Sequence, residues 1–174
     1  GLHQAWFRYG SRRWDIQAGR FLLSYGDERV LAQANWNQTA RAWDGVRGRL
    51  RPLDGAQLDL FVTKYGEASA TSDPRARPAW AQDDYLAGAY LTLDRDLARL
   101  ADVELFALWD QRTTFDDEDA AAPPVRRRLS TLGARLDGAF GPATLVTEGV
   151  GQLGRRCELR GLDARQCRDG TSQD

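Results

Sequence analysis

Apolar and polar residues alternate along most of this chain with the period of two that is typical of β-strands. In residues 57–65, for example, Leu58, Leu60 and Val62 share one face, because successive side chains of a strand point to opposite sides. Segments with this alternation are about 9–12 residues long, the length that a tilted strand needs to cross a bilayer. Strands of soluble sandwiches are typically about 5–6 residues long. The pattern therefore favours membrane-crossing strands.

The connections between these segments are alternately short and long. Short connections fall at residues 10–13, 52–56, 94–100 and 138–142, and long ones at residues 25–40, 66–82 and 113–125. A hairpin ladder that crosses a membrane has this rhythm, because every second connection emerges on the same side. We predict an all-β fold, an antiparallel up-and-down transmembrane β-barrel over residues 1–155 with about eight strands present. Residues 156–174 are predicted to form an irregular tail.

The composition is compatible with this fold. Totals of 42% hydrophobic and 28% charged residues fit a soluble domain, but they also fit a barrel whose strands show only one face to lipid. Tryptophan and tyrosine lie near the predicted strand ends, where membrane interfaces favour them. The chain opens without a Met or a signal-like segment, and we expect it to be an open, curved segment of a larger barrel wall. The formal net charge of −1 disfavours a nucleic-acid partner.

A row of arginines marks the face that must avoid lipid. In the predicted strand over residues 41–51, Arg41, Arg47 and Arg49 share one face. One charged side chain on the lipid face costs roughly 2–4 kcal/mol near the midplane, so this face is predicted to point inward. By the same alternation, the predicted inward set also includes Asp59, Glu104, Arg135 and Glu148. These groups could attract an anionic solute, or they could simply pair with one another across strands to fill the interior.

Two charged residues break the alternation. Arg20 falls on the Ile16 face of its strand and Asp44 falls on the Val46 face of the next one. Either both lie at a rim above the hydrocarbon, or a bulge at Gly45 and a twist near Gly19 turn them inward. Because they flank the long connection at similar distances, we predict that Arg20 and Asp44 contact each other.

Residues 19–50 resemble the alginate-export family of outer-membrane β-barrels. The resemblance is carried by Gly19–Arg20, by Gly26–Asp27–Glu28–Arg29 and by Trp43–Asp44–Gly45–Val46–Arg47, with similar pieces in QLDLFVTK, STLGARLDG and TEGVGQLGR. It implies a large monomeric barrel of about 18 strands with an electropositive pore. It also implies an outer-membrane location and export of an anionic polysaccharide. By position, the resemblance places Arg20, Arg41, Asp44, Arg47 and Arg49 along the pore.

The resulting expectation is a channel for anionic polysaccharides or small anionic solutes, with outer-membrane lipid and periplasmic export components as partners. No cofactor is expected, and Cys157 and Cys167 lack the spacing of a metal site. We predict no enzymatic activity. The main enzyme alternative is an outer-membrane hydrolase, but the sole histidine, His3, has no serine motif beside it. The other alternative is a soluble carbohydrate-binding β-protein that presents its aromatic residues to sugar.

Overall fold

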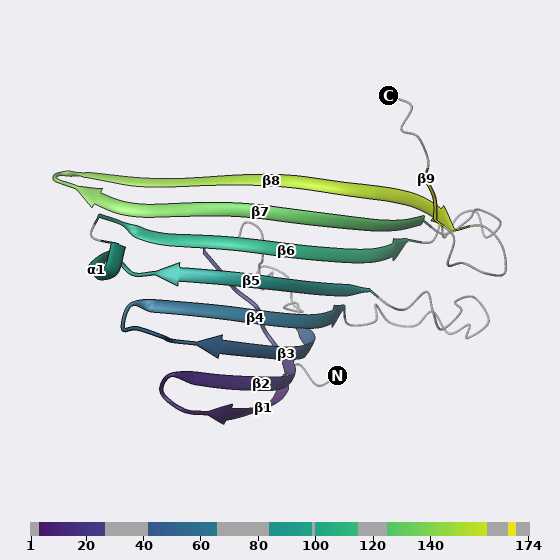
Figure 1. The fold of residues 1–174 in the computed structure, drawn as a ribbon, viewed down its shortest axis with the longest axis horizontal. Coiled ribbons are helices and arrows are strands. Elements are labelled where there is room, and N and C mark those ends of the chain that lie inside the picture. The colour runs from purple at the N-terminus through teal and green to yellow at the C-terminus, as the bar shows by residue number, and fades with distance from the viewer. Residues whose placement is uncertain are drawn as a thin grey trace.

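The computed structural model describes residues 4–26, 42–65, 84–98, 100–114, 125–159 and 167–169. They form one antiparallel sheet of nine strands in chain order (Figure 1). The strands are β1 (Ala5–Gly10), β2 (Trp14–Phe21), β3 (Trp43–Leu50), β4 (Ala56–Tyr65), β5 (Tyr85–Leu93), β6 (Asp102–Thr114), β7 (Val125–Phe140), β8 (Ala143–Leu159) and β9 (Cys167–Asp169). One short helix, α1 (Arg95–Ala98), joins β5 to β6. The prediction of an all-β, antiparallel fold is confirmed.

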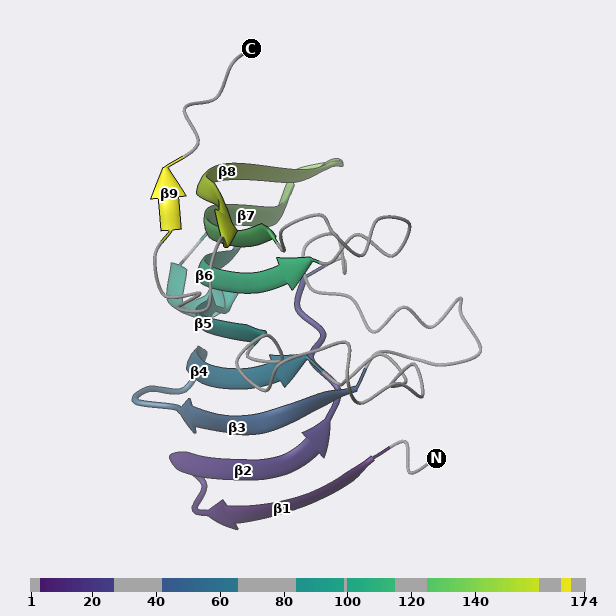
Figure 2. The same cartoon turned by 90° about the vertical axis from the view of Figure 1, so that its right-hand side faces the viewer.

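The sheet is a curved meander (Figure 2). Within the described residues β1 pairs only with β2 and β9 only with β8, so this part of the chain forms an open sheet. No helix among these residues is long and apolar enough to span a membrane. The predicted short connections agree with the observed hairpins, although the third one contains α1. The three predicted long connections lie largely outside the described residues.

Regular structure extends into the predicted tail. β8 continues to Leu159, and the three-residue β9 pairs with its end. The sequence lost its alternation at Arg155, but hydrogen bonding to β7 holds the backbone in a strand whatever the side chains are. Side-chain alternation alone therefore ended the strand too early.

The two faces of the sheet differ in character. One face, called here the inner face, carries buried polar and aromatic side chains such as Asp15, Asp59 and Tyr90. The opposite or outer face carries exposed apolar side chains, for example Val62 and Leu132, which are 56% and 63% exposed. An exposed apolar face of this extent is unusual for a soluble monomer.

The chain after β2 folds back over the inner face instead of leaving the sheet. In Figure 1 this segment, residues 22–26, crosses the neighbouring strands. Leu23 is fully buried, and the Tyr25 ring stacks on Tyr90 of β5 with centroids 4.2 Å apart. We call residues 22–26 the inserted segment. The predicted long connection over residues 25–40 agrees with the interval between β2 and β3, but the alternation did not predict that Tyr25 packs on the inner face.

Glycines opposite aromatic residues make room for this arrangement. Phe61 lies directly opposite Gly88, and Phe106 lies directly opposite Gly133. In both pairs the ring covers the glycine so closely that a methyl group there would overlap it. Phe61 and Tyr90 form the surface on which Tyr25 stacks, and Phe106 stacks on Tyr90.

Candidate functional site on the inner face

Asp15 of β2 is the centre of the first charged group. It accepts hydrogen bonds from Arg8 Nη2 at 2.8 Å, from Arg49 Nε at 2.8 Å and from Arg51 Nη1 at 3.0 Å. These arginines come from β1, from β3 and from the residue after β3, and Asp15 is only 3% exposed beneath them. Hydrogen bonds between ionised groups are roughly twice as strong as neutral ones, so this carboxylate fixes the three guanidinium groups in place.

Arg47 is held more loosely than Arg49. Its Nη2 donates to Gln17 Oε1 at 2.8 Å, but its closest carboxylate oxygen, Asp59 Oδ2, is 4.0 Å away. Its guanidinium carbon lies 5.6 Å from the centre of the Phe21 ring. The Nε atom of Arg47 and the Oδ1 atom of Asp59 are buried and have no hydrogen-bond partner among the described residues. Arg47 therefore retains donor capacity on the inner face.

Tyr25 of the inserted segment connects this group to the middle of the sheet. Its hydroxyl donates to Asp59 Oδ2 at 2.9 Å, while its ring stacks on Phe61 and Tyr90. Burial, and then the negative charge of Asp59, raise the pKa of the Tyr25 hydroxyl well above its ordinary value. The hydroxyl thus stays protonated and acts as a donor.

A second charged group surrounds Arg135 of β7. Glu104 accepts hydrogen bonds from the Tyr90 hydroxyl and, at 3.3 Å, from Arg135 Nη1. Arg135 Nη2 also donates to Asp137 at 2.9 Å, and Glu148 lies directly opposite Arg135 in the β7–β8 register. Because Tyr90 stacks on Tyr25, the two charged groups are joined through the aromatic layer.

The two groups have opposite net charge. The arginine cluster comprises four guanidinium groups and two carboxylates: Arg8, Arg47, Arg49, Arg51, Asp15 and Asp59. The carboxylate cluster comprises one guanidinium group and three carboxylates: Arg135, Glu104, Asp137 and Glu148. The arginine cluster on β1–β4 therefore carries an excess of positive charge and the carboxylate cluster around Arg135 an excess of negative charge. A separate inner-face row at the other end of β6–β8, Arg112, Arg127 and Arg156, is again positive, and Asp110 pairs with its first two members.

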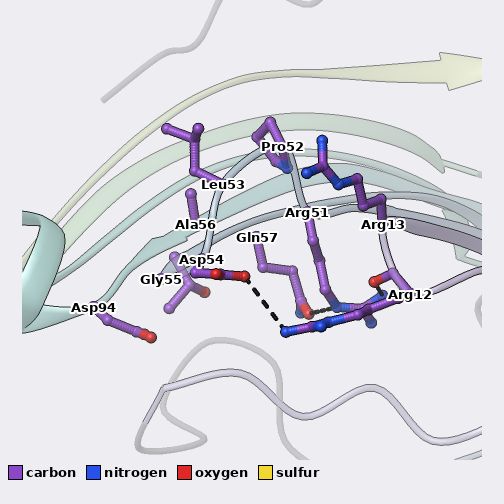
Figure 3. A pocket seen from close by; sticks show the side chains of 11 residues that line it. Arg12, Arg13, Arg51, Pro52, Leu53, Asp54, Gly55, Ala56, Gln57 and Asp94 are labelled. Atoms are coloured by element: carbon purple, nitrogen blue, oxygen red, sulfur yellow. Dashed lines mark hydrogen bonds and ion pairs between the residues drawn. The ribbon is translucent and has the colours of Figure 1, made fainter.

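An open pocket of about 660 Å³ extends the arginine cluster to the short-turn end of the sheet. Figure 3 shows Arg12, Arg51 and Gln57 reaching to one side of the strands, while Arg13 points to the other. Arg51 Nε donates to Gln57 Oε1 at 3.0 Å, and Arg12 Nη2 lies 3.9 Å from Asp54 Oδ1. Since Arg51 also binds Asp15, the pocket is continuous with the arginine cluster.

The structure brings most of the predicted site residues to one face. The inner face holds Arg47, Arg49, Asp59, Glu104, Arg135 and Glu148, and Arg41 lies outside the described residues. The sequence did not identify Tyr25 and Tyr90 as part of the site. The run of apolar residues at 21–23, which breaks the alternation after β2, was the available signal.

Arg20 and Asp44 lie on the outer face, not along the inner one. They are directly opposite each other in an uninterrupted β2–β3 register, so no bulge turns them inward. Arg20 Nε donates to Asp44 Oδ1 at 2.8 Å and its Nη2 donates to Oδ2 at 2.6 Å. The predicted contact is confirmed, but the placement differs from the pore-lining position that the resemblance implied.

The described residues contain no group of three or more His, Cys, Asp or Glu side chains that could hold a metal ion. The comparisons with known proteins found no matching family model, no matching curated protein and no matching solved structure.

Proposed function

We propose that this chain forms part of the wall of an outer-membrane β-barrel and that its inner face provides a path for anionic solutes. The observation that carries the proposal is the division of one sheet between an exposed apolar face and a face lined by guanidinium groups. This is the arrangement that a barrel needs between lipid and an aqueous interior.

The outer face supports contact with hydrocarbon. Its exposed apolar side chains follow one another across neighbouring strands in register, as Ile16, Leu60 and Leu132 do. The exposed rings of Trp14 and Trp109 lie among them. Moving such a side chain from water into lipid contributes about 1.5–3 kcal/mol of favourable free energy when the side chain becomes fully buried.

The stagger of the hairpins supports a tilted wall. A row of directly opposed residues runs from Asp15 of β2 to Gly133 of β7. At β2 this row lies beside the first turn, but at β7 it lies well before the fourth turn, which follows Phe140. The turns therefore advance by about one residue per strand, and with a rise of ~3.3 Å against a strand spacing of ~4.8 Å this corresponds to a tilt of ~35°. Membrane barrels have tilts of about 35–45°.

The arginine cluster supports the choice of an anionic solute. Arginine is always protonated, and its planar fork of donors matches a carboxylate, so a row of guanidinium groups offers successive weak sites. Asp15 and Asp59 moderate the attraction, which allows release as well as binding. The solute class follows the resemblance to alginate exporters: an anionic polysaccharide, or a small anion that uses the same groups.

A soluble carbohydrate-binding protein is the competing proposal. Its aromatic residues would form a flat platform, but the exposed Tyr9 and Trp14 rings meet edge to face at 69°. If the protein is recovered in the soluble fraction without detergent and binds sugar there, this alternative replaces the channel.

Ion selectivity in a planar bilayer tests the channel. The protein is compared with Arg47→Gln, with Arg49→Gln and with Arg95→Gln, a control that removes one exposed charge from α1. We expect the ratio of anion to cation permeability to fall towards unity in the first two variants and to be unchanged in the third. Unchanged selectivity in both inner-face variants would remove the arginine cluster from the path.

A further inference from the structure

A row of polar residues, three of them basic, borders the apolar side chains of the outer face at the end opposite the short turns, and it begins beside Asp44, which lies directly opposite Lys64. Lys64, Tyr85, Gln111, Arg128 and Arg155 follow one another as directly opposed residues of β4, β5, β6, β7 and β8. We call them the outer basic row. The next row on the same face includes Val62, Ala87 and Trp109, which are apolar.

Two arginines of this row face each other. Arg128 and Arg155 are directly opposed and both are exposed. Like charges in this position destabilise a sheet, because the side chains of opposed residues lie only about 5 Å apart at Cβ. Arg128 Nε donates to Gln111, and among the described residues neither Arg155 nor Lys64 forms an ion pair with a carboxylate. A bound anion between the two guanidinium groups would turn this repulsion into attraction.

An apolar groove begins next to the outer basic row. Two open depressions of about 660 and 550 Å³ share Ala89, Ala107 and Leu132, so they form one continuous groove along β5 and β6. The groove extends from the level of Trp109 to the level of Leu105, which is a length of ~13 Å. Alanines of β5 and β6 form its floor, and larger side chains on the neighbouring strands, such as Leu60 and Leu132, border it.

We propose that this outer surface binds one phospholipid-type molecule, with its phosphate at Arg128 and Arg155 and an acyl chain in the groove. The inference rests on the proposed membrane location. The apolar length matches an extended acyl segment, and the basic side chains stand where the headgroup of that lipid would lie. Because both parts face outward, the ligand is a membrane lipid and not the solute of the inner face.

Tryptophan quenching by brominated lipids tests this inference, since Trp109 lines the groove and Trp14 is exposed on the same face. The full chain is titrated in detergent with brominated phosphatidylglycerol and with brominated phosphatidylcholine. We expect the anionic lipid to quench at roughly thirtyfold lower mole fraction, because each of the two arginines contributes about a fivefold preference for an anionic headgroup. The Arg128→Gln/Arg155→Gln variant should lose this preference, while inorganic phosphate should not restore it.

The matched control is Arg127→Gln/Arg156→Gln. It removes the same charge from the adjacent directly opposed pair, which faces the other side of β7 and β8. An Ala107→Leu variant, which fills the groove, should weaken quenching by both lipids without removing the preference. The inference would be overturned if Arg128→Gln/Arg155→Gln kept the preference for phosphatidylglycerol, or if the control variant lost this preference to the same extent. If phosphatidylcholine quenches normally but no preference exists, only the lipid site fails; if neither lipid quenches, the membrane proposal fails with it.

Discussion

Replacing Asp15 by Asn should destabilise the protein far more than replacing Asp44, although each substitution removes one carboxylate charge. Asn has nearly the same shape, but it offers one neutral oxygen to three guanidinium groups and directs its own N–H donors at them. Breaking a buried charge pair costs about 3–5 kcal/mol. Because the side chains of Arg8 and Arg51 are 44% and 29% exposed and can still reach water, we expect about 2–4 kcal/mol for Asp15→Asn.

The Asp44→Asn control affects a pair with good geometry in an exposed place. Arg20 and Asp44 make two hydrogen bonds, but their side chains are 41% and 43% exposed, and exposed pairs contribute about 0–1 kcal/mol. The free energy of unfolding is measured by urea denaturation in one detergent, followed by far-ultraviolet circular dichroism. Equal losses in the two variants would refute the reasoning, because they would mean that the burial of Asp15 does not strengthen its bonds.

Three further predictions concern the aromatic layer. Gly133→Ala should cost about 1–3 kcal/mol, because its methyl group overlaps the Phe106 ring, whereas Gly149→Ala, with open space around it, should stay within about 0.5 kcal/mol in the same urea assay. Tyr25→Phe should cost about 1–3 kcal/mol by leaving Asp59 without its hydroxyl donor. Because folding raises the pKa of Tyr25, the stabilisation by its hydroxyl is present below about pH 10 and is lost as the pH rises further. Between neutral pH and pH 11, urea denaturation should therefore show a larger loss of stability for the wild type than for Tyr25→Phe. Parallel stability curves for the two proteins would contradict this.

The alternation of apolar and polar residues was sufficient to predict eight of the nine strands, although it ended β8 too early, and it predicted the face of most site residues. It placed Arg47, Arg49 and Asp59 together on the inner face because a strand has a fixed period of two. It also allowed the Arg20–Asp44 contact to be predicted, since both residues lie at similar distances from one connection.

The partners of individual residues could not be predicted in the same way. A two-residue turn fixes the register of a hairpin, but β2 and β3 are joined by about twenty residues, which leave their register open. The choice of Asp15 as the common acceptor of Arg49 and Arg51 depends on that register. The alternation also could not predict the position of Tyr25, because this position depends on tertiary contacts with Phe61 and Tyr90, which are distant in the sequence.

The inserted segment links the arginine cluster to the carboxylate cluster on the inner face. Tyr25 lies between them: its hydroxyl binds Asp59 of the arginine cluster, and its ring covers Tyr90, whose hydroxyl binds Glu104 of the carboxylate cluster. Under the proposed function, the arginine cluster attracts an anion and the carboxylate cluster repels it, so the attractive and repulsive groups lie on the two sides of Tyr25. Strands β4 and β5 lie between β3, which carries Arg47 and Arg49, and β6, which carries Glu104, so the carboxylates of the second cluster do not neutralise the excess positive charge near β3.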